Sequence, residues 1–248
     1  MPNEDSAEVM RRGGVEAGRL HVTGFPVPAF FGENAARLSP PYLTLPQNVG
    51  GVPPPRTAAP RVLYIINSGT NHAFETARLL IEESAWEITI AVGRDELLRR
   101  ELTLLTEGRT LPAQILGWTD QIPHLLMTHH VVISKAGGAT VQEAIAARCP
   151  MVVNQIVPGQ EEGNYELLRR AGAGALATTP ATVVTTLREA FANQGALWRK
   201  WRAGLDPIVR NDAARVIAQH LLTASDPLSV KRSALNVERF PASAAVLP

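Results

Sequence analysis

The stretch VVISKAGGATVQEAIAARCPMVVNQIVPGQEEGN, residues 131–164, decides the fold of this chain. Its first three residues form a short β-branched run, as expected of a strand that is covered on both faces. The glycine pair 137–138 then predicts a turn, and residues 140–148 are good helix formers with apolar residues at helical spacing. A second apolar run at 151–153 predicts another strand, and the polar residues 158–164 predict a loop after it. The stretch therefore predicts a strand–turn–helix–strand unit.

The glycine turn of this unit has two interpretations. A helix that begins directly after a glycine turn presents free N–H groups and a positive dipole end, which suit a phosphate group. Such a turn also occurs in many α/β proteins only to reverse the chain, and Ala136-Gly137-Gly138 is not a G-x-G-x-x-G fingerprint. Both a phosphate site and a purely structural turn remain open on these residues alone.

The alternation of strands and helices extends from about residue 61 to about residue 223. We expect strands at 61–67, 87–92, 113–116, 131–133, 151–153 and 175–177. We expect helices at 73–83, 96–105, 122–127, 140–148, 165–171, 180–194 and 211–224. This alternation predicts an α/β fold, a Rossmann-like doubly wound parallel sheet with helices on both faces. Ligands bind such sheets at the carboxyl ends of the strands.

Polar turns follow several of the expected strands, at 67–71, 117–119, 134–140 and 158–164. Because the carboxyl ends of parallel strands meet at one edge of the sheet, these turns can converge on one ligand. Their convergence favours a ligand cleft more than any single turn does.

Composition excludes several classes of protein. The chain has 248 residues, 45% of them hydrophobic, so it can bury a substantial core. A formal net charge of +1 argues against nucleic acid as a partner. The single cysteine, Cys149, excludes an intrachain disulfide and a cysteine zinc site, and we expect a small buried hydrophobe. No apolar run is long enough to span a bilayer and the polar start lacks a signal peptide, so we expect a cytoplasmic location.

The chain divides into four parts. Prolines recur through residues 26–60, which predicts an interdomain linker or wrapping loop without a long helix. Residues 1–25 look like a helix and a short strand at 19–22, the remnant of a preceding N-terminal domain. Residues 61–223 form the expected ligand-binding domain, and residues 224–248 look like a C-terminal tail.

Two motifs carry a resemblance to a known family. The residues SKAGGATVQEA at 134–144 and PGQEEGN at 158–164 resemble the donor-binding C-terminal domain of family 28 glycosyltransferases. The branch they resemble most contains monogalactosyldiacylglycerol synthases and diacylglycerol glucosyltransferases, whose patterns are K-A-G-x-x-T-x-x-E-A and P-G-Q-E-x-x-N. The likeness runs from about Glu4 to about Ala224. It implies the C-terminal half of a GT-B fold, in which a nucleotide sugar lies between two Rossmann-like domains.

The resemblance implies a role for each of the polar turns. Donor diphosphate binding is implied for Ser68, Gly69, Gly137, Gly138, Ala139 and Thr140. Ribose binding is implied for Glu143, base binding for Trp118 and Thr119, and sugar binding for Gln160, Glu161 and Asn164. A carboxylate suits ribose because it accepts hydrogen bonds from two hydroxyl groups at once.

Each implied role has a structural alternative. Glu143 can be a first-turn glutamate that the helix dipole favours. Trp118 can be a core residue, and the loop at 158–164 can be merely solvated. Lys135 either neutralises phosphate charge or is a solvated lysine.

The sequence also departs from the family pattern. The first turn, Asn67-Ser68-Gly69-Thr70, is poorer in glycine than its counterparts, so close backbone approach to phosphates is less assured there. His129-His130 stands where the family usually has an aspartate at the second position. Adjacent histidines on a strand point to opposite sides, so we expect packing or surface roles and no metal site.

The function implied by the resemblance is that of the donor-binding domain of an inverting hexosyltransferase. Its donor is a UDP-sugar, and its acceptor is a lipid such as diacylglycerol, which implies peripheral association at the inner face of the membrane. Positioning and stabilisation of the UDP leaving group by a helix terminus need no metal or other cofactor.

The general base is expected in an N-terminal acceptor domain, so no catalytic residue is assigned within this sequence. We expect either a truncated product or a subunit that pairs with a separate acceptor-domain chain. The alternative function is a non-catalytic nucleotide-sugar-binding subunit of a split glycosyltransferase. A dinucleotide-dependent oxidoreductase is disfavoured, because no G-x-G-x-x-G follows the strand at 61–67.

Overall fold

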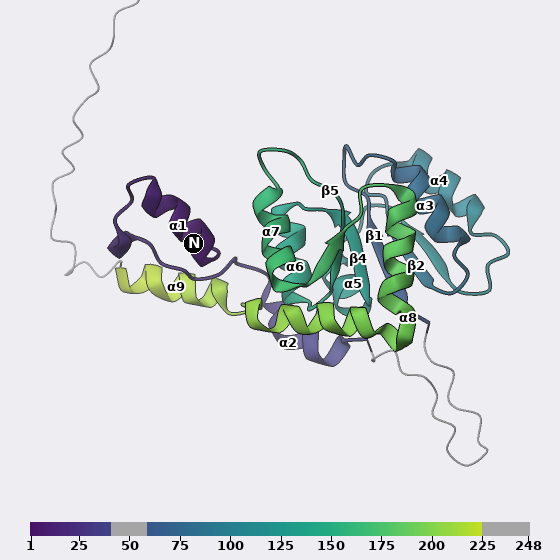
Figure 1. Cartoon of the computed structure of the whole chain (residues 1–248). Coiled ribbons are helices and arrows are strands. Elements are labelled where there is room, and N and C mark those ends of the chain that lie inside the picture. The colour runs from purple at the N-terminus through teal and green to yellow at the C-terminus, as the bar shows by residue number, and fades with distance from the viewer. Residues whose placement is uncertain (41–58, 225–248) are drawn as a thin grey trace, which may run out of the picture.

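The computed structural model describes residues 1–40 and 59–224. In this part of the chain six parallel strands form one sheet in the order β3-β2-β1-β4-β5-β6 (Figure 1). The strands are β1 (Arg61–Ile65), β2 (Glu87–Ala91), β3 (Ala113–Leu116), β4 (Val131–Lys135), β5 (Met151–Gln155) and β6 (Gly174–Leu176). The helices after them are α3 (Ala73–Glu82), α4 (Glu96–Leu105), α5 (Ile122–Thr128), α6 (Gly138–Ala146), α7 (Glu162–Ala171) and α8 (Pro180–Leu205). The predicted Rossmann-like doubly wound sheet is confirmed.

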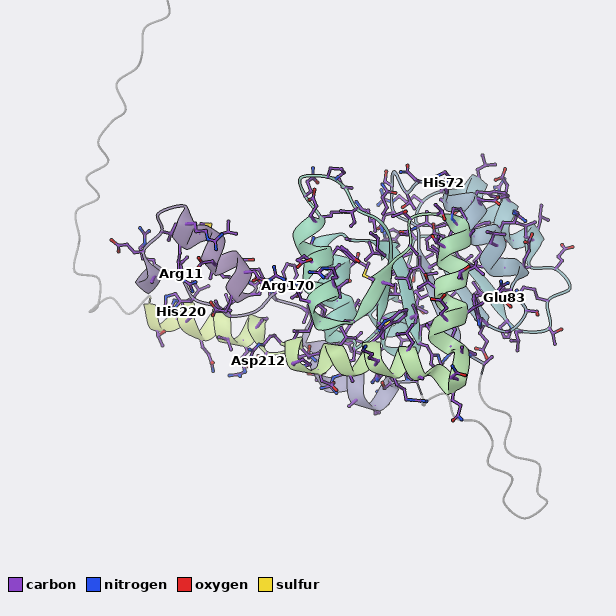
Figure 2. All side chains as sticks on the ribbon, viewed as in Figure 1. Arg11, His72, Glu83, Arg170, Asp212 and His220 are labelled. Atoms are coloured by element: carbon purple, nitrogen blue, oxygen red, sulfur yellow. The ribbon has the colours of Figure 1, made fainter. Side chains whose placement is uncertain are left out.

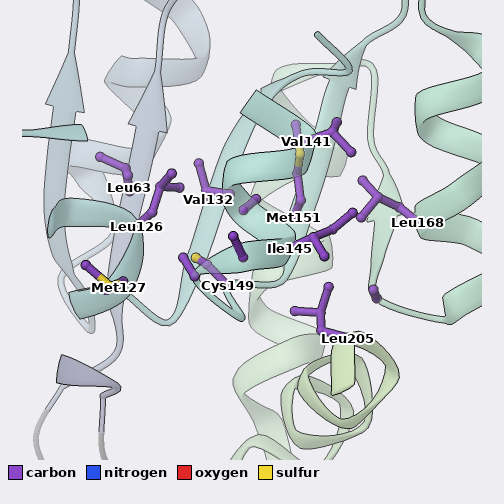
Figure 3. Packing of buried hydrophobic residues seen from close by; sticks show 14 of the residues in the cluster. Leu63, Leu126, Met127, Val132, Val141, Ile145, Cys149, Met151, Leu168 and Leu205 are labelled. Atoms are coloured by element: carbon purple, nitrogen blue, oxygen red, sulfur yellow. The ribbon is translucent and has the colours of Figure 1, made fainter. Parts of the chain in front are cut away.

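The central strands are buried on both faces, as their continuous apolar sequences predict. Val132 of β4 packs with α5, α6 and α7 on one face, whereas Ile133 packs with α3 and α8 on the other. Figure 3 shows the first of these layers, where Val132 and Met151 of the sheet meet Val141 and Ile145 of α6. Burial of each such side chain stabilises the fold by about 1.5–3 kcal/mol.

The direction of winding reverses between β1 and β4. β1 pairs with β2 on one side and with β4 on the other, and all of these pairs are parallel. Helix α3 leaves β1 toward one face of the sheet, and α6 leaves β4 toward the opposite face. A crevice therefore opens at the carboxyl ends of β1 and β4, which is where doubly wound sheets bind ligands.

The segment before the sheet differs from its prediction in two places. The expected helix is present as α1 (Glu4–Arg12), but residues 19–22 are not a strand, and a 3₁₀ turn η1 (Ala17–Arg19) begins this stretch. A strand needs a neighbouring strand to pair with, whereas Met1 and His220 lie beside this segment. The Met1 amino group donates to His21 O at 2.6 Å, and Thr23 N donates to Met1 O at 3.1 Å.

A helix also forms in the proline-rich segment. Helix α2 (Ala29–Leu38) has 10 residues, between Pro28 at its N-cap and Pro40 beyond its end. The prolines bound this helix instead of interrupting it, so these residues form a helix where the sequence predicted a linker or wrapping loop without a long helix. Phe31 and Ala35 are buried in the layer that contains α5 and α6, and this packing stabilises α2. The remaining prediction for residues 41–58, like that for the tail at 225–248, lies outside the described residues.

Several helix boundaries differ from the expected ones, and those of α7 and α8 differ most. Helix α7 begins at Glu162, so the end of the predicted loop, including Asn164, belongs to its first turn. Helix α8 continues beyond residue 194 to Leu205, across a kink at residues 192–195, and its second half buries Trp198. Helix α9 (Ala213–Ala224) lies beside α1, away from the sheet (Figure 1). No helix among the described residues is long and apolar enough to cross a membrane.

Candidate functional site

The turn between β4 and α6 presents the start of a helix at the crevice. Gly137 N donates to Lys135 O at 2.8 Å, which closes a tight turn directly after the strand. Gly137 is the N-cap residue of α6, and no side chain caps this helix. The first N–H groups of α6, from Gly138 to Thr140, therefore point toward the edge of the sheet together with the positive end of the helix dipole.

The two glycines of this turn are not required by backbone conformation. Gly137 has a φ of −61°, which any residue can adopt. A Cβ atom built on Gly137 lies 3.7 Å from Glu161 Oε1, and one built on Gly138 lies 3.6 Å from Asn164 Nδ2. Because the glycines have no side chain, the backbone of the turn stays uncovered where it faces the loop after β5.

The loop after β5 is bonded to this turn. Glu161 is buried, with 6% of its surface exposed, and its Oε2 accepts a hydrogen bond from Val157 N at 3.0 Å. Its Oε1 lies 3.3 Å from Lys135 Nζ. Asn164 Nδ2 donates to Ala136 O at 2.9 Å. The loop is therefore not simply solvated, and Lys135, which remained open between two roles, is paired with Glu161.

Gln160 differs from these two neighbours. Its side chain is exposed and has no hydrogen-bond partner among the described residues, whereas its backbone N donates to Val157 O at 3.2 Å. Of the three predicted sugar-binding residues, Gln160 thus has the amide that is accessible to a ligand. Glu161 and Asn164 lie in or next to the same loop, but their side chains are already bonded to Lys135 and Ala136.

The turn after β1 reaches the same crevice. Ser68 and Gly69 are exposed, and Gly69 has a φ of +73°, a left-handed conformation that favours glycine. Gln155 Nε2, at the end of β5, donates to Gly69 O at 3.1 Å. Asn67 Nδ2 donates to Ser134 Oγ of β4 at 2.8 Å. The turn can be located in Figure 2 by the label of His72, which lies at the end of the turn and precedes α3.

Three residues that join these turns had no individual role assigned from the sequence, although two of them lie in the predicted polar turns at 67–71 and 134–140. Asn67, Ser134 and Gln155 connect the carboxyl ends of β1, β4 and β5 by side-chain hydrogen bonds. Ser134 is completely buried, so its hydroxyl depends on such a partner. Their signal in the sequence is a polar residue that ends an otherwise apolar strand.

Glu143 carries a carboxylate that the protein leaves unpaired. The side chain is half-buried, and among the described residues it makes no hydrogen bond or ion pair. Burial raises the pKa of this carboxyl above its usual value. Glu143 follows Thr140 by three residues, so both lie on the same side of α6. Glu143 lies beyond the first turn of α6, which contains no acidic residue, so the alternative of a first-turn glutamate is excluded. Its unpaired, partly desolvated carboxylate is available to a ligand that donates hydrogen bonds.

The turn after β3 exposes an aromatic side chain. Trp118 is 69% exposed, which excludes the alternative that it is a core residue. Thr119 Oγ1 accepts a hydrogen bond from Gln121 N at 3.1 Å, which shapes the turn before α5. Strands β2 and β1 lie between β3 and β4. Trp118 is thus about 14 Å from the α6 turn along the edge, since neighbouring strands are about 4.8 Å apart.

The two adjacent histidines serve packing, as predicted. His129 is buried and bonds to Leu125 O at 2.7 Å and to Thr89 Oγ1 at 2.9 Å. Burial lowers the pKa of His129 to about 4. His130 Nδ1 accepts a hydrogen bond from Arg61 N at 2.9 Å. In residues 1–40 and 59–224 no group of three or more His, Cys, Asp or Glu side chains is placed to hold a metal ion.

Cys149 is also a packing residue. It is 1% exposed among the apolar residues around α6, and burial raises the pKa of its thiol to about 12. A thiol that stays protonated and inaccessible is unreactive. The prediction of a small buried hydrophobe is confirmed.

A cavity of about 480 Å³ lies between α1 and the first turns of α6 and α7. Its lining includes Val9, Gly138, Asn164 and Leu167. Arg170 Nη1 of α7 contacts Asp5 Oδ1 of α1 at 2.9 Å, and Figure 2 shows Arg170 on the side of α7 that faces α1. The cavity therefore adjoins the α6 turn on the side of residues 1–25.

The sequence of this chain is similar to those of known glycosyltransferases. The model of the glycosyltransferase family 28 C-terminal domain matches residues 69–194. A processive diacylglycerol beta-glucosyltransferase of Bacillus subtilis is 24% identical over 160 residues, which are 64% of this chain and 42% of that protein. A probable chloroplastic monogalactosyldiacylglycerol synthase 2 of Oryza sativa is 33% identical over 132 residues, 50% of this chain and 26% of that protein. The matches thus span less than half the length of these relatives.

Solved structures show the same fold at low sequence identity. MurG of Acinetobacter baumannii superposes with a TM-score of 0.56 and 16% identity, over 68% of this chain and 51% of that one. The UDP-GlcNAc 2-epimerase of Neisseria meningitidis, bound to UDP-GlcNAc, superposes with a TM-score of 0.63 and 14% identity, over 90% and 60% of the two chains. The suspected family is confirmed. The chain belongs to the glycosyltransferase family 28 C-terminal domain family, and its sheet is the C-terminal half of a GT-B fold.

Proposed function

We propose that this chain is the donor-binding domain of an inverting hexosyltransferase that uses a UDP-sugar. The observation that carries the proposal is the uncapped N-terminus of α6 at the switch point, with the unpaired carboxylate of Glu143 on the same side of the helix. Family membership supports glycosyl transfer as the reaction to which the domain contributes.

The diphosphate is assigned to the turn between β4 and α6. Backbone N–H groups of Gly138, Ala139 and Thr140 are free to donate to phosphate oxygens, and the helix dipole favours negative charge there. The Thr140 hydroxyl adds a donor. The turn at Ser68 and Gly69, joined to β5 through Gln155, borders the same place.

The nucleoside is assigned to the edge of the sheet from β4 toward β3. The Glu143 carboxylate can accept hydrogen bonds from two ribose hydroxyls, which also compensates for its partial burial. Trp118 offers an exposed indole on which the uracil can stack, and Thr119 lies beside it. We assign the hexose hydroxyls to Gln160, whose amide is accessible, next to Glu161 and Asn164.

Transfer with inversion needs an in-line displacement at the anomeric carbon. The acceptor hydroxyl oxygen forms the new bond to this carbon, and the bond to the diphosphate oxygen breaks, leaving its electron pair on UDP. The hydroxyl proton passes to a general base, which we assign to an N-terminal acceptor domain. The α6 terminus stabilises the charge that develops on UDP, so this assignment uses no metal ion and no other cofactor.

The acceptor that we propose is a lipid hydroxyl, such as that of diacylglycerol. It is supported by relatives that are named diacylglycerol beta-glucosyltransferase and monogalactosyldiacylglycerol synthase. A lipid acceptor implies that the protein is cytoplasmic and associates peripherally with the inner face of the membrane. The acceptor domain would be supplied by a longer form of the protein or by a separate chain.

Titration calorimetry with UDP tests the donor site. We expect binding by the wild-type chain, equal binding in EDTA and in Mg²⁺, and at least tenfold weaker binding by Glu143→Ala, since hydrogen bonds to a charged group contribute about 1.5–3 kcal/mol. Glu107→Ala is the control, because Glu107 is exposed and follows the C-terminal end of α4. Absence of UDP affinity at millimolar concentration would exclude the proposal, and loss of binding in EDTA would exclude its metal-free form.

The alternative function is a non-catalytic nucleotide-sugar-binding subunit of a split glycosyltransferase. It shares the donor site, so UDP binding does not distinguish the two functions. The two functions are distinguished by adding an acceptor domain, UDP-glucose and diacylglycerol to the chain and measuring transfer. Product formation that depends on Gly138 and Glu143 supports the transferase, whereas binding without any transfer in the reconstituted pair supports the alternative.

A further inference from the structure

One carboxylate fastens the loop between β5 and α7. Glu161 immediately precedes α7, and its side chain is 7% exposed. Oε2 accepts from Val157 N at 3.0 Å, which closes the loop on itself, and Oε1 lies 3.3 Å from Lys135 Nζ. A carboxylate this deeply buried needs partners of this kind. Little of its surface is left for a sugar hydroxyl.

The same carboxylate lies against the glycine turn. The Cβ position of Gly137 is 3.7 Å from Glu161 Oε1, which is van der Waals contact. One helical turn further, Asn164 Nδ2 donates to Ala136 O at 2.9 Å. Lys135 and Ala136 directly precede the turn. The loop is therefore attached to the turn at two points, and Glu161 provides the charged one.

We propose that Glu161 is a positioning residue for the diphosphate and not a reader of the sugar. By holding the Lys135 ammonium and the Val157 N–H on one carboxylate, it keeps Lys135 beside the N-terminus of α6. The ammonium and the free N–H groups of α6 then face the diphosphate from one surface. This inference rests on the proposed UDP-sugar site and gives Glu161 a different role within it.

Loss of the charge on Glu161 has a defined consequence. In Glu161→Gln the amide can still accept from Val157 N, but it no longer attracts Lys135. The lysine side chain, which is 27% exposed, then extends into solvent. The ligand loses a correctly placed positive charge at the diphosphate, whereas the surfaces for uracil and hexose stay as they are.

The experiment compares uridine, UDP, UDP-glucose and UDP-galactose on the wild-type chain and on Glu161→Gln. Calorimetry measures the nucleotides, and ligand-observed NMR at millimolar concentration measures uridine. We expect UDP and the UDP-sugars that bind to weaken by the same factor, about tenfold, and uridine to be unchanged. Glu107→Gln, the same charge change at an exposed remote position, should alter none of these affinities.

Other outcomes overturn the inference. A loss confined to the UDP-sugars means that Glu161 reads the hexose, and an equal loss for uridine means general disruption of the site. Unchanged UDP affinity means that the pair does not position the diphosphate. A wild-type chain that binds none of the nucleotides instead defeats the proposed function itself.

Lys135→Met tests the pair from its other side and does not depend on the folding of Glu161→Gln. It should weaken UDP by a similar factor and leave uridine unchanged. The double variant should then be no weaker than Lys135→Met alone, because the carboxylate acts through the lysine. Additive losses in the double variant would show that Glu161 and Lys135 act separately, contrary to the inference.

Discussion

Asn67 Nδ2 donates a hydrogen bond of 2.8 Å to Ser134 Oγ, and this bond joins the carboxyl ends of β1 and β4. The two strands are neighbours at the point where the winding of the sheet reverses. Ser134 is fully buried, so Asn67 is the partner that satisfies its hydroxyl across the crevice. The spacing of the two turns that border the proposed diphosphate site therefore depends on this bond.

Asn67→Ala tests this relationship. We expect the free energy of unfolding to fall by about 1–3 kcal/mol, because the buried Ser134 hydroxyl loses its partner. UDP affinity should fall as well, since the turn at Ser68 is released. Urea denaturation and calorimetry measure the two effects. Gln114→Ala, at an exposed position of β3, serves as the control, and equal effects of both substitutions would contradict the prediction.

Gly138→Ala should separate stability from binding. The position is helical and the added Cβ lies 3.6 Å from Asn164 Nδ2, an ordinary van der Waals contact, so the fold tolerates alanine. The free energy of unfolding should rise by up to about 1 kcal/mol. UDP should nevertheless bind more weakly, because a methyl group covers the turn. Thermal unfolding measures the gain in stability, and calorimetry measures the loss of UDP affinity. Gly18→Ala, with open space around it, is the control, and unchanged UDP affinity in Gly138→Ala would remove the turn from the site.

Trp118 gives a spectroscopic test of base binding. The chain has 4 tryptophans, and Trp86, Trp198 and Trp201 are buried, whereas Trp118 is 69% exposed. Stacking of uracil should quench its fluorescence, and Trp118→Leu should abolish the quenching and weaken UDP by about 1–3 kcal/mol. Stability should change by less than about 0.5 kcal/mol. Quenching that persists in Trp118→Leu would place the base elsewhere.

His129 predicts a pH dependence of stability. Its folded pKa of about 4 lies below the ordinary histidine value of 6.5, because burial disfavours the charged ring. Between these values the unfolded chain binds more protons than the folded one, so stability falls as the pH falls from about 6.5 to about 4. The loss from this residue is about 3 kcal/mol.

Denaturation of His129→Asn at pH 7 and at pH 4.5 checks this assignment. The variant should show a smaller loss between the two pH values than the wild-type chain shows. His124→Asn, at an exposed position of α5, should keep the wild-type loss. A wild-type loss retained in His129→Asn would mean that other groups cause it.

Much of the fold could be predicted from local patterns. The bounds of α4 and β3 match the expected 96–105 and 113–116, because periodic or apolar runs are bounded there by turn residues. Helix α2 was missed, since its apolar stripe is short and lies among prolines, and its stability comes from burial of Phe31 and Ala35. The strand expected at residues 19–22 failed for the opposite reason, because its apolar residues found no strand to pair with.

The motifs of the candidate site could be recognised in the sequence, but the bonds between their residues could not. The motifs at 134–144 and 158–164 carry the family resemblance, which the matched domain confirms. They did not reveal that Glu161 pairs with Lys135, or that Asn164 bonds to Ala136. Nor did they show that Gln155 reaches Gly69, a partner 86 residues away in the chain.

The sequence by itself determined the parallel sheet, the glycine turn before α6 and the family, because these follow from periodicity, turn residues and short motifs that act locally. Only the tertiary structure decided which side chains of the site stay free for a ligand. Gln160, Trp118 and the carboxylate of Glu143 do, whereas Glu161 and Asn164 are engaged by the glycine turn and the residues before it. These partners come from segments that are distant in the chain, so they depend on how those segments pack. A buried charge needs a partner, and the packing determines which group lies close enough to serve.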